Sequence, residues 1–306
     1  MGEVIVIGGA NLDVKGKSAV GFVPRTSNPG HVMTGVGGVA RNIAANLARL
    51  DIKAALISAV GSDEAGNRIL DVTRQAGVDV TMVKRVDGSS GTYLAVLDDK
   101  GELHGAISDM TCLEALTVAD LAAQASRLKS ASLIAADCNL AIECLDWLFA
   151  FAEENRIRLL IEPVSVPKAQ KLKRLRRGGR AFAVTPNADQ FASLTGAAVD
   201  DPKAFAALHA MGYANIVVHR GRAGAILSDG AARPIAIPAQ ATGPVADVTG
   251  AGDAAVAGLI CGFLQGYDLA RSARLGQAAA AIKIASAASV SPGLNRVSLF
   301  TLAGSS

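Results

Sequence analysis

The sequence Asp247-Val248-Thr249-Gly250-Ala251-Gly252-Asp253 leads into a run of small and apolar residues that continues to Leu264. Gly250 and Gly252 lack a Cβ atom, so the backbone can turn sharply and a ligand can approach it closely. The run that follows is typical of a buried helix, whose first amides have no partner within the helix and carry partial positive charge. The stretch therefore predicts an anion-binding site at the amides of Gly250, Ala251 and Gly252.

Asp253 lies at the same turn, where it would face the bound anion. An anion site beside a carboxylate suits phosphoryl transfer, because the protein mainly positions the groups while a carboxylate accepts the proton of the attacking hydroxyl. We expect Asp253 to be this catalytic base, and we expect the helix N-terminus to keep it ionised at neutral pH. The alternative is a helix that carries an acid in its first turn for stability alone.

A second glycine-rich turn, Gly35-Val36-Gly37-Gly38, runs into a helix predicted over residues 43–50. With Asn42, it resembles the N-terminal signature G-G-x-x-x-N of the ribokinase-like (PfkB) family of carbohydrate and nucleoside kinases. Residues 247–253 resemble the C-terminal signature of that family, D-T-x-G-A-G-D, with Val248 in place of a Thr. The resemblance implies a phosphotransferase that uses ATP and Mg²⁺ to phosphorylate an alcohol group.

Short β-branched runs alternate with helical patterns, as a parallel sheet flanked by helices requires. We expect one α/β domain over residues 1–306 with the ribokinase-like fold, a central mostly parallel sheet flanked by helices. Residues 91–110 alternate around a turn and predict a β-hairpin. The resemblance implies a small β-sheet lid built from about 14–35 and 90–110. Strands are expected at 4–7, 54–60, 132–136, 158–162, 181–185, 216–219 and 225–228, and the later helices at 117–129, 141–155, 188–195, 202–211, 250–265 and 268–289.

Composition excludes several other classes. The net charge of +3 is small and aromatic residues make up 4% of the chain, so we expect no nucleic-acid partner. No uncharged apolar run is long enough to cross a membrane, and the four cysteines show no metal-ligand spacing. These features favour a cytoplasmic protein with reduced thiols. A basic run from Lys168 to Arg180 has two interpretations, a nucleic-acid patch or the solvated face of a helix, and we favour the second.

The acceptor site implied by the resemblance consists of Asn11, Asp13, Gly37, Gly38 and Asn42. Carboxylates and amides suit a sugar because its hydroxyl groups both donate and accept hydrogen bonds, and the glycines let a ring lie against the backbone. The structural alternatives are turn capping by Asn11 and Asp13 and helix N-capping by Asn42.

The nucleotide site implied by the resemblance contains Asn187, Gly221, Gly224 and Thr249. Asn187 belongs to a segment in which the family has P-N-x-x-E, but this chain has Gln190 in the place of the Glu. This departure concerns the magnesium ion, because the acid of that segment helps to organise it in relatives.

Two acidic residues are predicted near metal ions. Glu162 precedes Pro163, where relatives more often have Asp-Pro, and is expected to reach Mg²⁺ through water. Asp247 and Thr249, with residues 286–295, match the region that holds a monovalent cation such as K⁺ in relatives.

Segments spread over nearly the whole chain resemble the pseudouridine kinases of the family more than the ribokinases, among them residues 9–14, 26–30, 107–110 and 136–139. The acceptor implied is the 5′-hydroxyl of pseudouridine. Asn139 would read the uracil edge or a ribose hydroxyl, and Thr92 and Met110 would cover the base; N-capping by Asn139 and core packing by Met110 are the alternatives. Other nucleosides, free sugars such as ribose, and a catalytically silent relative stay open. Exposed lid strands also favour a homodimer.

Overall fold

The computed structural model describes residues 2–175, 180–231, 233–240 and 243–304. Within these residues a large sheet has the strand order β13-β12-β11-β10-β9-β8-β1-β4-β5. The strands from β11 to β5 in this order are parallel, whereas β12 and β13 are antiparallel additions at one edge. Their bounds are β1 Val4–Ile7, β4 Ala54–Gly61, β5 Asp79–Val86, β8 Leu133–Asp137, β9 Leu159–Glu162, β10 Ala181–Val184, β11 Tyr213–His219, β12 Ala225–Ser228 and β13 Ile235–Ile237.

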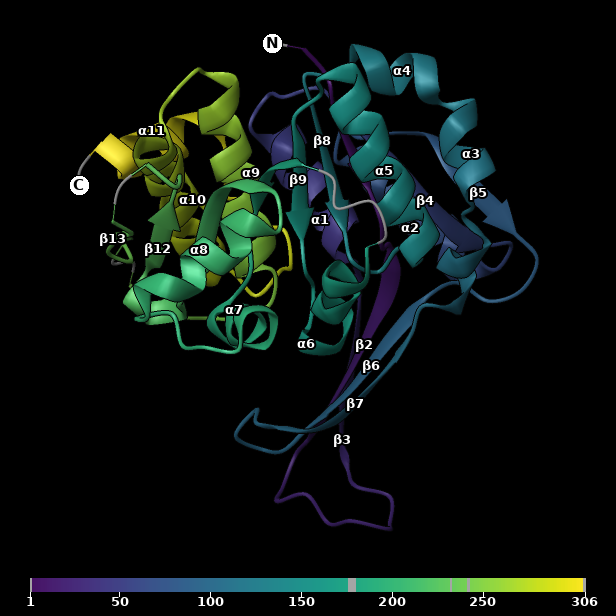
Figure 1. Ribbon diagram of the computed structural model, residues 1–306. Helices are drawn as coiled ribbons and strands as arrows, with labels where there is room; N and C mark the ends of the chain where they lie inside the picture. Colours follow the sequence, from purple (N-terminus) through teal and green to yellow (C-terminus); the bar gives the residue numbers. More distant parts are fainter. Residues whose placement is uncertain (1, 176–179, 232, 241–242, 305–306) are drawn as a thin grey trace.

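Helices cover both faces of this sheet (Figure 1). In β1 the side chains of Val4 and Val6 join one hydrophobic core while those of Ile5 and Ile7 join the other, because successive side chains of a strand point to opposite faces. The first core includes α1 Val39–Arg49, α2 Glu64–Gln75, α9 Ala251–Leu264, α10 Leu269–Ile284 and α11 Arg296–Gly304. The second includes α3 Val118–Ala123, α4 Ala125–Ser130, α5 Ile142–Asn155, α6 Val166–Ala169, α7 Ala188–Thr195 and α8 Pro202–Ala210. The predicted α/β class is confirmed.

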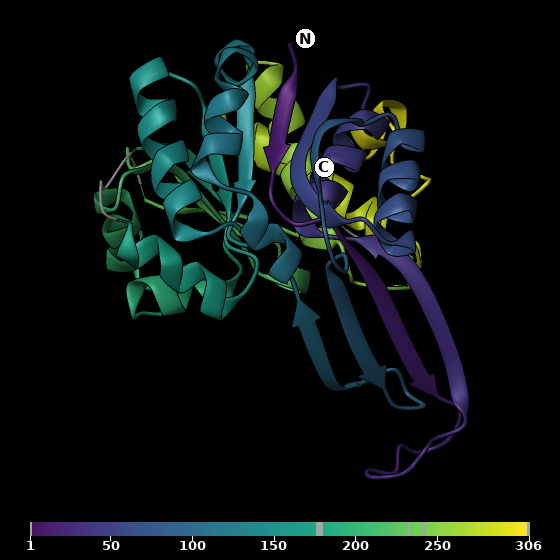
Figure 2. The same cartoon turned by 90° about the vertical axis from the view of Figure 1, so that its right-hand side faces the viewer.

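Four further strands form a second sheet, named here the small sheet, which projects from the body of the molecule (Figures 1 and 2). Its order is β3-β2-β6-β7, with bounds β2 Asn11–Ser18, β3 Gly30–Gly37, β6 Thr92–Leu97 and β7 Leu103–Asp109. Only three residues separate β1 from β2. Asn11 therefore lies where the central strand of the body passes into the small sheet.

Several element bounds differ from the sequence-based expectation. The helix expected over 117–129 is two helices, with Gln124 non-helical between them at φ −96° and ψ 7°. β5 and α11 were not predicted, and α10 ends at Ile284 instead of 289. β5 is a half-exposed edge strand of mixed polarity, so it lacks the apolar run that marks the central strands. No helix in the described ranges has the length and apolarity needed to span a membrane.

Candidate active site

The two glycine-rich turns lie side by side, since α1 packs against α9. Asn42, in the first turn of α1, donates a hydrogen bond of 2.8 Å from Nδ2 to Oδ2 of Asp253 in the first turn of α9. The N-cap of α1 is Gly38, so the N-capping alternative for Asn42 is wrong. The bond joins the two signatures, 211 residues apart in the chain, into one site.

A buried arginine orients Asn42. Nη1 of Arg41 donates to Oδ1 of Asn42 over 3.1 Å and to the carbonyl oxygen of Val36 over 3.3 Å, while Nε donates to Thr73. Burial lowers the pKa of Arg41 to about 10, so it remains a cation at neutral pH. Because Oδ1 of Asn42 is occupied by a donor, its Nδ2 is directed at Asp253. The sequence analysis did not single out Arg41.

Asp253 does not behave as its helix position predicted. Burial raises its pKa to about 7, and the charges of Asp137 and Asp13 act in the same direction, while the hydrogen bond from Asn42 opposes them. The expectation of a carboxylate fully ionised at neutral pH is therefore wrong, because desolvation outweighs the helix terminus. A carboxyl group with a pKa near neutrality suits a general base.

The turn before Asp253 depends on Gly250, which has φ 84° and acts as N-cap of α9. A Cβ atom there would lie 2.4 Å from the carbonyl oxygen of Ser289, so only glycine fits this close approach. The amide of Ala251 donates to the carbonyl oxygen of Val248 over 3.1 Å within the turn, so this one of the three amides predicted to bind the anion already has a partner. Gly252 has open space on the side of its absent Cβ.

The residues predicted for the acceptor lie together at the base of the small sheet. Nδ2 of Asn11 donates to Oδ1 of Asp13 over 2.7 Å, and both residues belong to β2, so the turn-capping alternative is wrong. The carboxylate of Asp13 covers Gly37, where a Cβ atom would lie 2.3 Å from Oδ2. Gly38 has φ 100° and lies against the carbonyl of Gly9. Burial raises the pKa of Asp13, and the hydrogen bond from Asn11 opposes the shift.

Asp137 organises this region, although the sequence analysis gave it no role. Its buried carboxylate accepts hydrogen bonds from the amides of Gly9 (2.9 Å), Ala40 (3.0 Å) and Asn139 (2.9 Å). It therefore ties the end of β1 to the N-terminus of α1 and to the loop after β8. Burial raises its pKa. The sequence signals were its position at the end of a buried strand and its place in the segment 136–139 that carries part of the resemblance.

Asn139 is held by two lysines of the basic run. Nζ of Lys168 donates to Oδ1 of Asn139, and Nζ of Lys171 donates to the carbonyls of Cys138 (3.0 Å) and Leu140 (2.8 Å). Burial lowers the pKa of Lys168. The interpretation of the run as a solvated helix face is wrong for these two residues; Arg176 and Arg177 lie outside the described residues. The N-cap of α5 is Ala141, so Asn139 is free of that structural role.

Met110 and Thr92 differ in their placement. Met110 and Asn11 both lie beside Gly91, since a Cβ atom on Gly91 would be 3.0 Å from Sδ of Met110 and 3.3 Å from Cβ of Asn11. Met110 therefore lies close to the acceptor residues. Thr92 pairs with Leu12, whereas Tyr93 pairs with Asp13. Since paired residues point to the same face of a sheet, Tyr93 and not Thr92 shares the face of Asp13.

Three of the predicted nucleotide residues, Asn187, Gly221 and Gly224, lie after β10 and β11, whereas Thr249 lies in the turn before α9. Oδ1 of Asn187 accepts from the amide of Gln190 (2.9 Å), and Oε1 of Gln190 accepts from the amide of Asn187 (2.8 Å). This is a reciprocal capping box at the start of α7. Gln190 is thus a buried structural residue whose amide replaces the family's Glu without loss of the cap.

Gly221 and Gly224 shape the turn after β11, at φ 55° and φ 82°. A Cβ atom on Gly224 would lie 2.0 Å from the carbonyl of Ile237. Beside this turn, Nε2 of His219 and Nε of Arg220 are buried without a hydrogen-bond partner in the described residues. Burial lowers the pKa of His219 to about 4, so the ring is neutral. Orphaned polar atoms next to a glycine turn fit a polar ligand such as a nucleotide.

Glu162 fits the magnesium role. Its carboxylate accepts from the amide of Val164 (3.0 Å) and from Oγ1 of Thr185 (2.8 Å), which leaves acceptor capacity on both oxygens. Burial raises its pKa to about 8, and the charge of Asp253 adds to the shift. Mg²⁺ commonly binds through one or two carboxylates, water and substrate phosphates, so a cluster of protein ligands is not required.

Asp247 and Thr249 do not fit a monovalent cation. Nζ of Lys15, from the small sheet, lies 3.1 Å from both Oδ2 of Asp247 and Oγ1 of Thr249. Nζ of Lys283 donates to the carbonyl of Asp247 over 2.7 Å and to that of Ser286 over 3.0 Å. Two ammonium groups therefore occupy the oxygens that a K⁺ ion would need.

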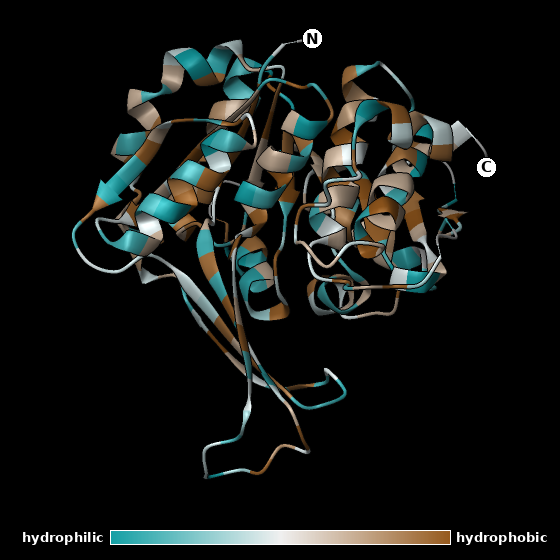
Figure 3. Cartoon of the chain, turned by 180° about the vertical axis from the view of Figure 1, so that it is seen from behind, coloured by the Kyte–Doolittle hydropathy of each residue, from teal (hydrophilic) through white to brown (hydrophobic). Residues whose placement is uncertain are grey.

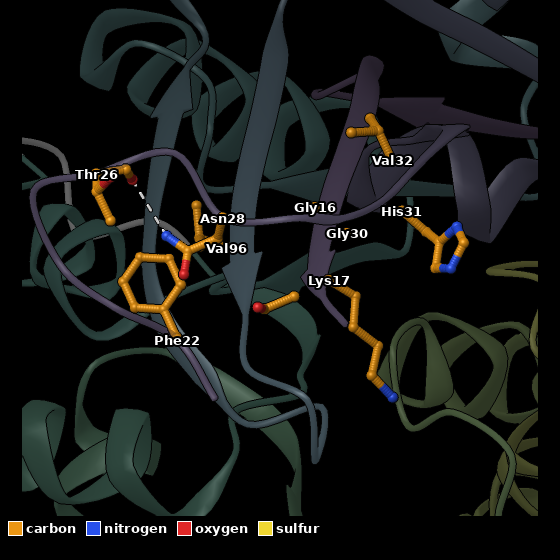
Figure 4. Close-up of a pocket in the computed structure, with 10 residues that line it drawn as sticks. Gly16, Lys17, Phe22, Thr26, Asn28, Gly30, His31, Val32 and Val96 are labelled. Atoms are coloured by element: carbon orange, nitrogen blue, oxygen red, sulfur yellow. Dashed lines mark hydrogen bonds between the residues drawn. The ribbon is translucent and has the colours of Figure 1, made fainter. Parts of the chain in front are cut away.

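A pocket of about 270 Å³ in the small sheet is distinct from this site (Figure 4). It is lined by Gly16, Lys17, Phe22, Asn28 and Val96, among others. It begins five residues beyond Asn11 along β2, roughly 17 Å at the rise of a strand. None of its lining residues is one of the predicted site residues.

The chain belongs to the pfkB family of carbohydrate kinases, whose model matches residues 1–294, and this membership makes it a phosphotransferase that acts on an alcohol group. The Escherichia coli pseudouridine kinase is 35% identical over 98% of this chain and 96% of its own. The guanosine-inosine kinase of Exiguobacterium acetylicum is 27% identical over 94% of this chain and 95% of its own.

Solved structures confirm the ribokinase-like fold. A carbohydrate kinase from Agrobacterium tumefaciens superposes with a TM-score of 0.85 at 29% identity, covering 99% of this chain and 97% of its own. Arabidopsis thaliana ribokinase, in complex with ribose and ATP, superposes with a TM-score of 0.83 at 19% identity, covering 99% of this chain and 98% of its own.

Proposed function

We propose that this protein is an ATP-dependent pseudouridine kinase that forms pseudouridine 5′-phosphate. The observation that carries the proposal is the hydrogen bond from Asn42 to Asp253, because it brings the predicted acceptor residues to the predicted base. The likeness to a pseudouridine kinase over nearly the whole of both chains supports this acceptor. The likeness to a guanosine-inosine kinase supports a purine nucleoside as the second candidate.

In the proposed reaction the 5′-hydroxyl oxygen attacks the γ-phosphorus of ATP. A bond forms between that oxygen and phosphorus, the bond from phosphorus to the β–γ bridging oxygen breaks, and ADP leaves. Asp253 accepts the proton of the hydroxyl, and Asn42 holds the carboxylate in place. The turn at Gly250, Ala251 and Gly252 receives the transferred phosphoryl group.

ATP would lie over the turns that contain Asn187 and Gly221 to Gly224, where His219 and Arg220 offer unpaired polar atoms. Glu162 would hold Mg²⁺ through water, and the ion would neutralise charge on the phosphates. Asp13 and Asn11 would bind ribose hydroxyls. Asn139 would donate to the ligand from the Nδ2 hydrogen that does not bond to Asp137, since Lys168 occupies its Oδ1.

The small sheet would act as a lid on one kinase domain that spans residues 1–306. Lys15 ties this lid to the anion turn through Asp247, which gives lid position a direct link to the catalytic centre. Met110 and Tyr93 would cover the base of the nucleoside, with Thr92 on the opposite face.

The outer face of the small sheet would pair with a second copy of the chain. Val32, Leu94 and Ile107 occupy matched positions on the face opposite Lys15, and all three are exposed, Val32 and Ile107 to about 70%. Hydrophobic residues recur along these strands in Figure 3. Ile107→Lys is expected to shift the protein from dimer to monomer in light scattering; a wild-type monomer would contradict the homodimer.

We place the activity in the cytoplasm, where the four free cysteines would stay reduced.

The test is a kinase assay with ATP and Mg²⁺ on pseudouridine, uridine, adenosine, inosine, guanosine and ribose, with product measured by mass. Preference for pseudouridine supports the proposal. Preference for another acceptor keeps the phosphotransferase and rejects the named substrate. Turnover of none of them would favour the silent relative.

A further inference from the structure

A buried lysine lies at the catalytic turn and has no part in the reaction described above. Lys283, in the last turn of α10, is 0% exposed. Its ammonium donates to two main-chain carbonyls, 2.7 Å from that of Asp247 and 3.0 Å from that of Ser286. A buried ammonium needs such acceptors, because burial without hydrogen bonds is costly.

The two carbonyls belong to segments that meet at the anion turn. The amides of Ala246 and Asp247 donate to the carbonyl of Ile284 over 2.7 and 3.3 Å, and Gly250 rests against the carbonyl of Ser289. Lys283 therefore fastens the start of the 247–253 turn to residues 284–289. The position of Gly250, and with it the phosphoryl site, depends on this junction.

The charge at this junction is balanced without any added ion. The carboxylate of Asp247 is held by Lys15 at 3.1 Å and by the amide of Thr249 at 2.8 Å. Burial lowers the pKa of Lys283, while the charges of Asp247 and Asp253 oppose that shift. A monovalent cation at the same carbonyls would meet two ammonium groups and would have to displace one of them.

We propose that the ammonium of Lys283 is a built-in cation that replaces a dissociable K⁺ ion at the catalytic turn. The predicted effect of Lys283 on turnover rests on the proposed phosphotransfer. The claim that its ammonium takes the place of a K⁺ ion does not. Lys283 is a positioning residue, and the protein needs no monovalent cation to fix the anion turn.

The test compares two variants in KCl and in tetramethylammonium chloride at equal ionic strength, with melting temperature as the first readout. Lys283→Ala leaves space and two free carbonyls, so it is expected to melt at a lower temperature and to regain stability in K⁺ but not in tetramethylammonium. Lys283→Met fills the space without a charge, so K⁺ is expected to have no effect. Lys173→Ala is the control, since Lys173 also donates to a main-chain carbonyl, that of Ser193, away from this turn.

Turnover is the second readout. Lys283→Ala is expected to lose roughly 10²-fold in tetramethylammonium, the scale of a small misplacement of catalytic groups, and to recover in K⁺ or methylammonium. The wild type is expected to be equally active in both salts. A wild type that requires K⁺, or that binds Tl⁺ at Asp247, would overturn the proposal, as would equal responses of the Ala and Met variants. If Lys283→Ala does not fold, Tl⁺ binding to the wild type still decides the test. If the protein is not a kinase, the melting temperatures still test the proposal, because they do not depend on turnover.

Discussion

The acceptor half and the nucleotide half of the site are built differently. On the acceptor side, buried polar and charged groups from distant segments bond directly to one another or to the turns, as Asn42, Asp253 and Asp137 do. On the nucleotide side, Asn187 and Gln190 cap their own helix, and His219 keeps an unpaired ring nitrogen. Asp253, the proposed base, is thus held by groups of the protein itself, whereas the nucleotide side retains groups that a ligand would satisfy. Variants on the acceptor side should change turnover, and those on the nucleotide side should change ATP affinity.

The largest effect is expected from Asp253→Asn, which removes the base but keeps its size. We predict a loss in kcat of roughly 10²–10⁴, the usual contribution of a general base, with ATP binding retained. Steady-state kinetics and nucleotide titration measure both. Asp71→Asn, an exposed acid on α2, is the control. Near-wild-type turnover of Asp253→Asn would remove Asp253 from the mechanism.

The same substitution should stabilise the protein at alkaline pH. The pKa of Asp253 is raised from 3.8 to about 7. The free energy of unfolding of the wild type therefore decreases as pH rises through that range, because the buried carboxyl group ionises in the folded state. Asn carries no such cost. We therefore expect Asp253→Asn to melt higher than the wild type at pH 8, with the difference vanishing near pH 4. A pH-independent difference would contradict the raised pKa.

A smaller effect is expected from Asn42→Ala. The variant removes the hydrogen bond that lowers the pKa of Asp253. We predict a loss in kcat of roughly 10–10²-fold through lost positioning, and an upward shift of the acidic limb of the pH profile. Asn46→Ala is the matched control, because Asn46 is buried one turn later in α1 and its amide is unpaired in the described residues. It should change stability without moving the pH profile.

Asn187→Ala tests the nucleotide half. Loss of the N-cap should cost about 1 kcal/mol and lower the melting temperature, and the KM for ATP should rise while kcat changes little. If kcat fell as far as in Asn42→Ala, the contrast between the two halves would be lost.

The smallest effect is expected from Gln190→Glu. Glutamate serves a capping box as well as glutamine does, so stability should be nearly unchanged, and the KM for Mg-ATP should change little because the side chain turns back to the amide of Asn187. A large loss of stability would show that the amide nitrogen of Gln190 has a role that the cap does not describe.

The sequence predicted the fold class, most of the strands and both glycine turns, because these depend on local patterns of apolar residues and glycines. It did not predict which polar groups would meet. Arg41, Asp137, Lys168 and Lys283 are assigned by tertiary contacts between segments far apart in the chain. The pKa of Asp253 was predicted wrongly for the same reason, since the helix terminus is visible in the sequence but the depth of burial is not. Thr92 was predicted to cover the base, but Tyr93 pairs with Asp13 and shares its face, because strand register is set by pairing that the sequence does not show.

The most direct test of the account is the pH dependence of kcat/KM for the acceptor in the wild type at saturating Mg-ATP. Since Asp253 must be deprotonated to accept the proton, and burial raises its pKa to about 7, log kcat/KM should rise with unit slope at acid pH and level off above about 7. A profile that is flat from pH 5.5 to 8 would contradict Asp253 as the buried base at the meeting point of the two glycine turns.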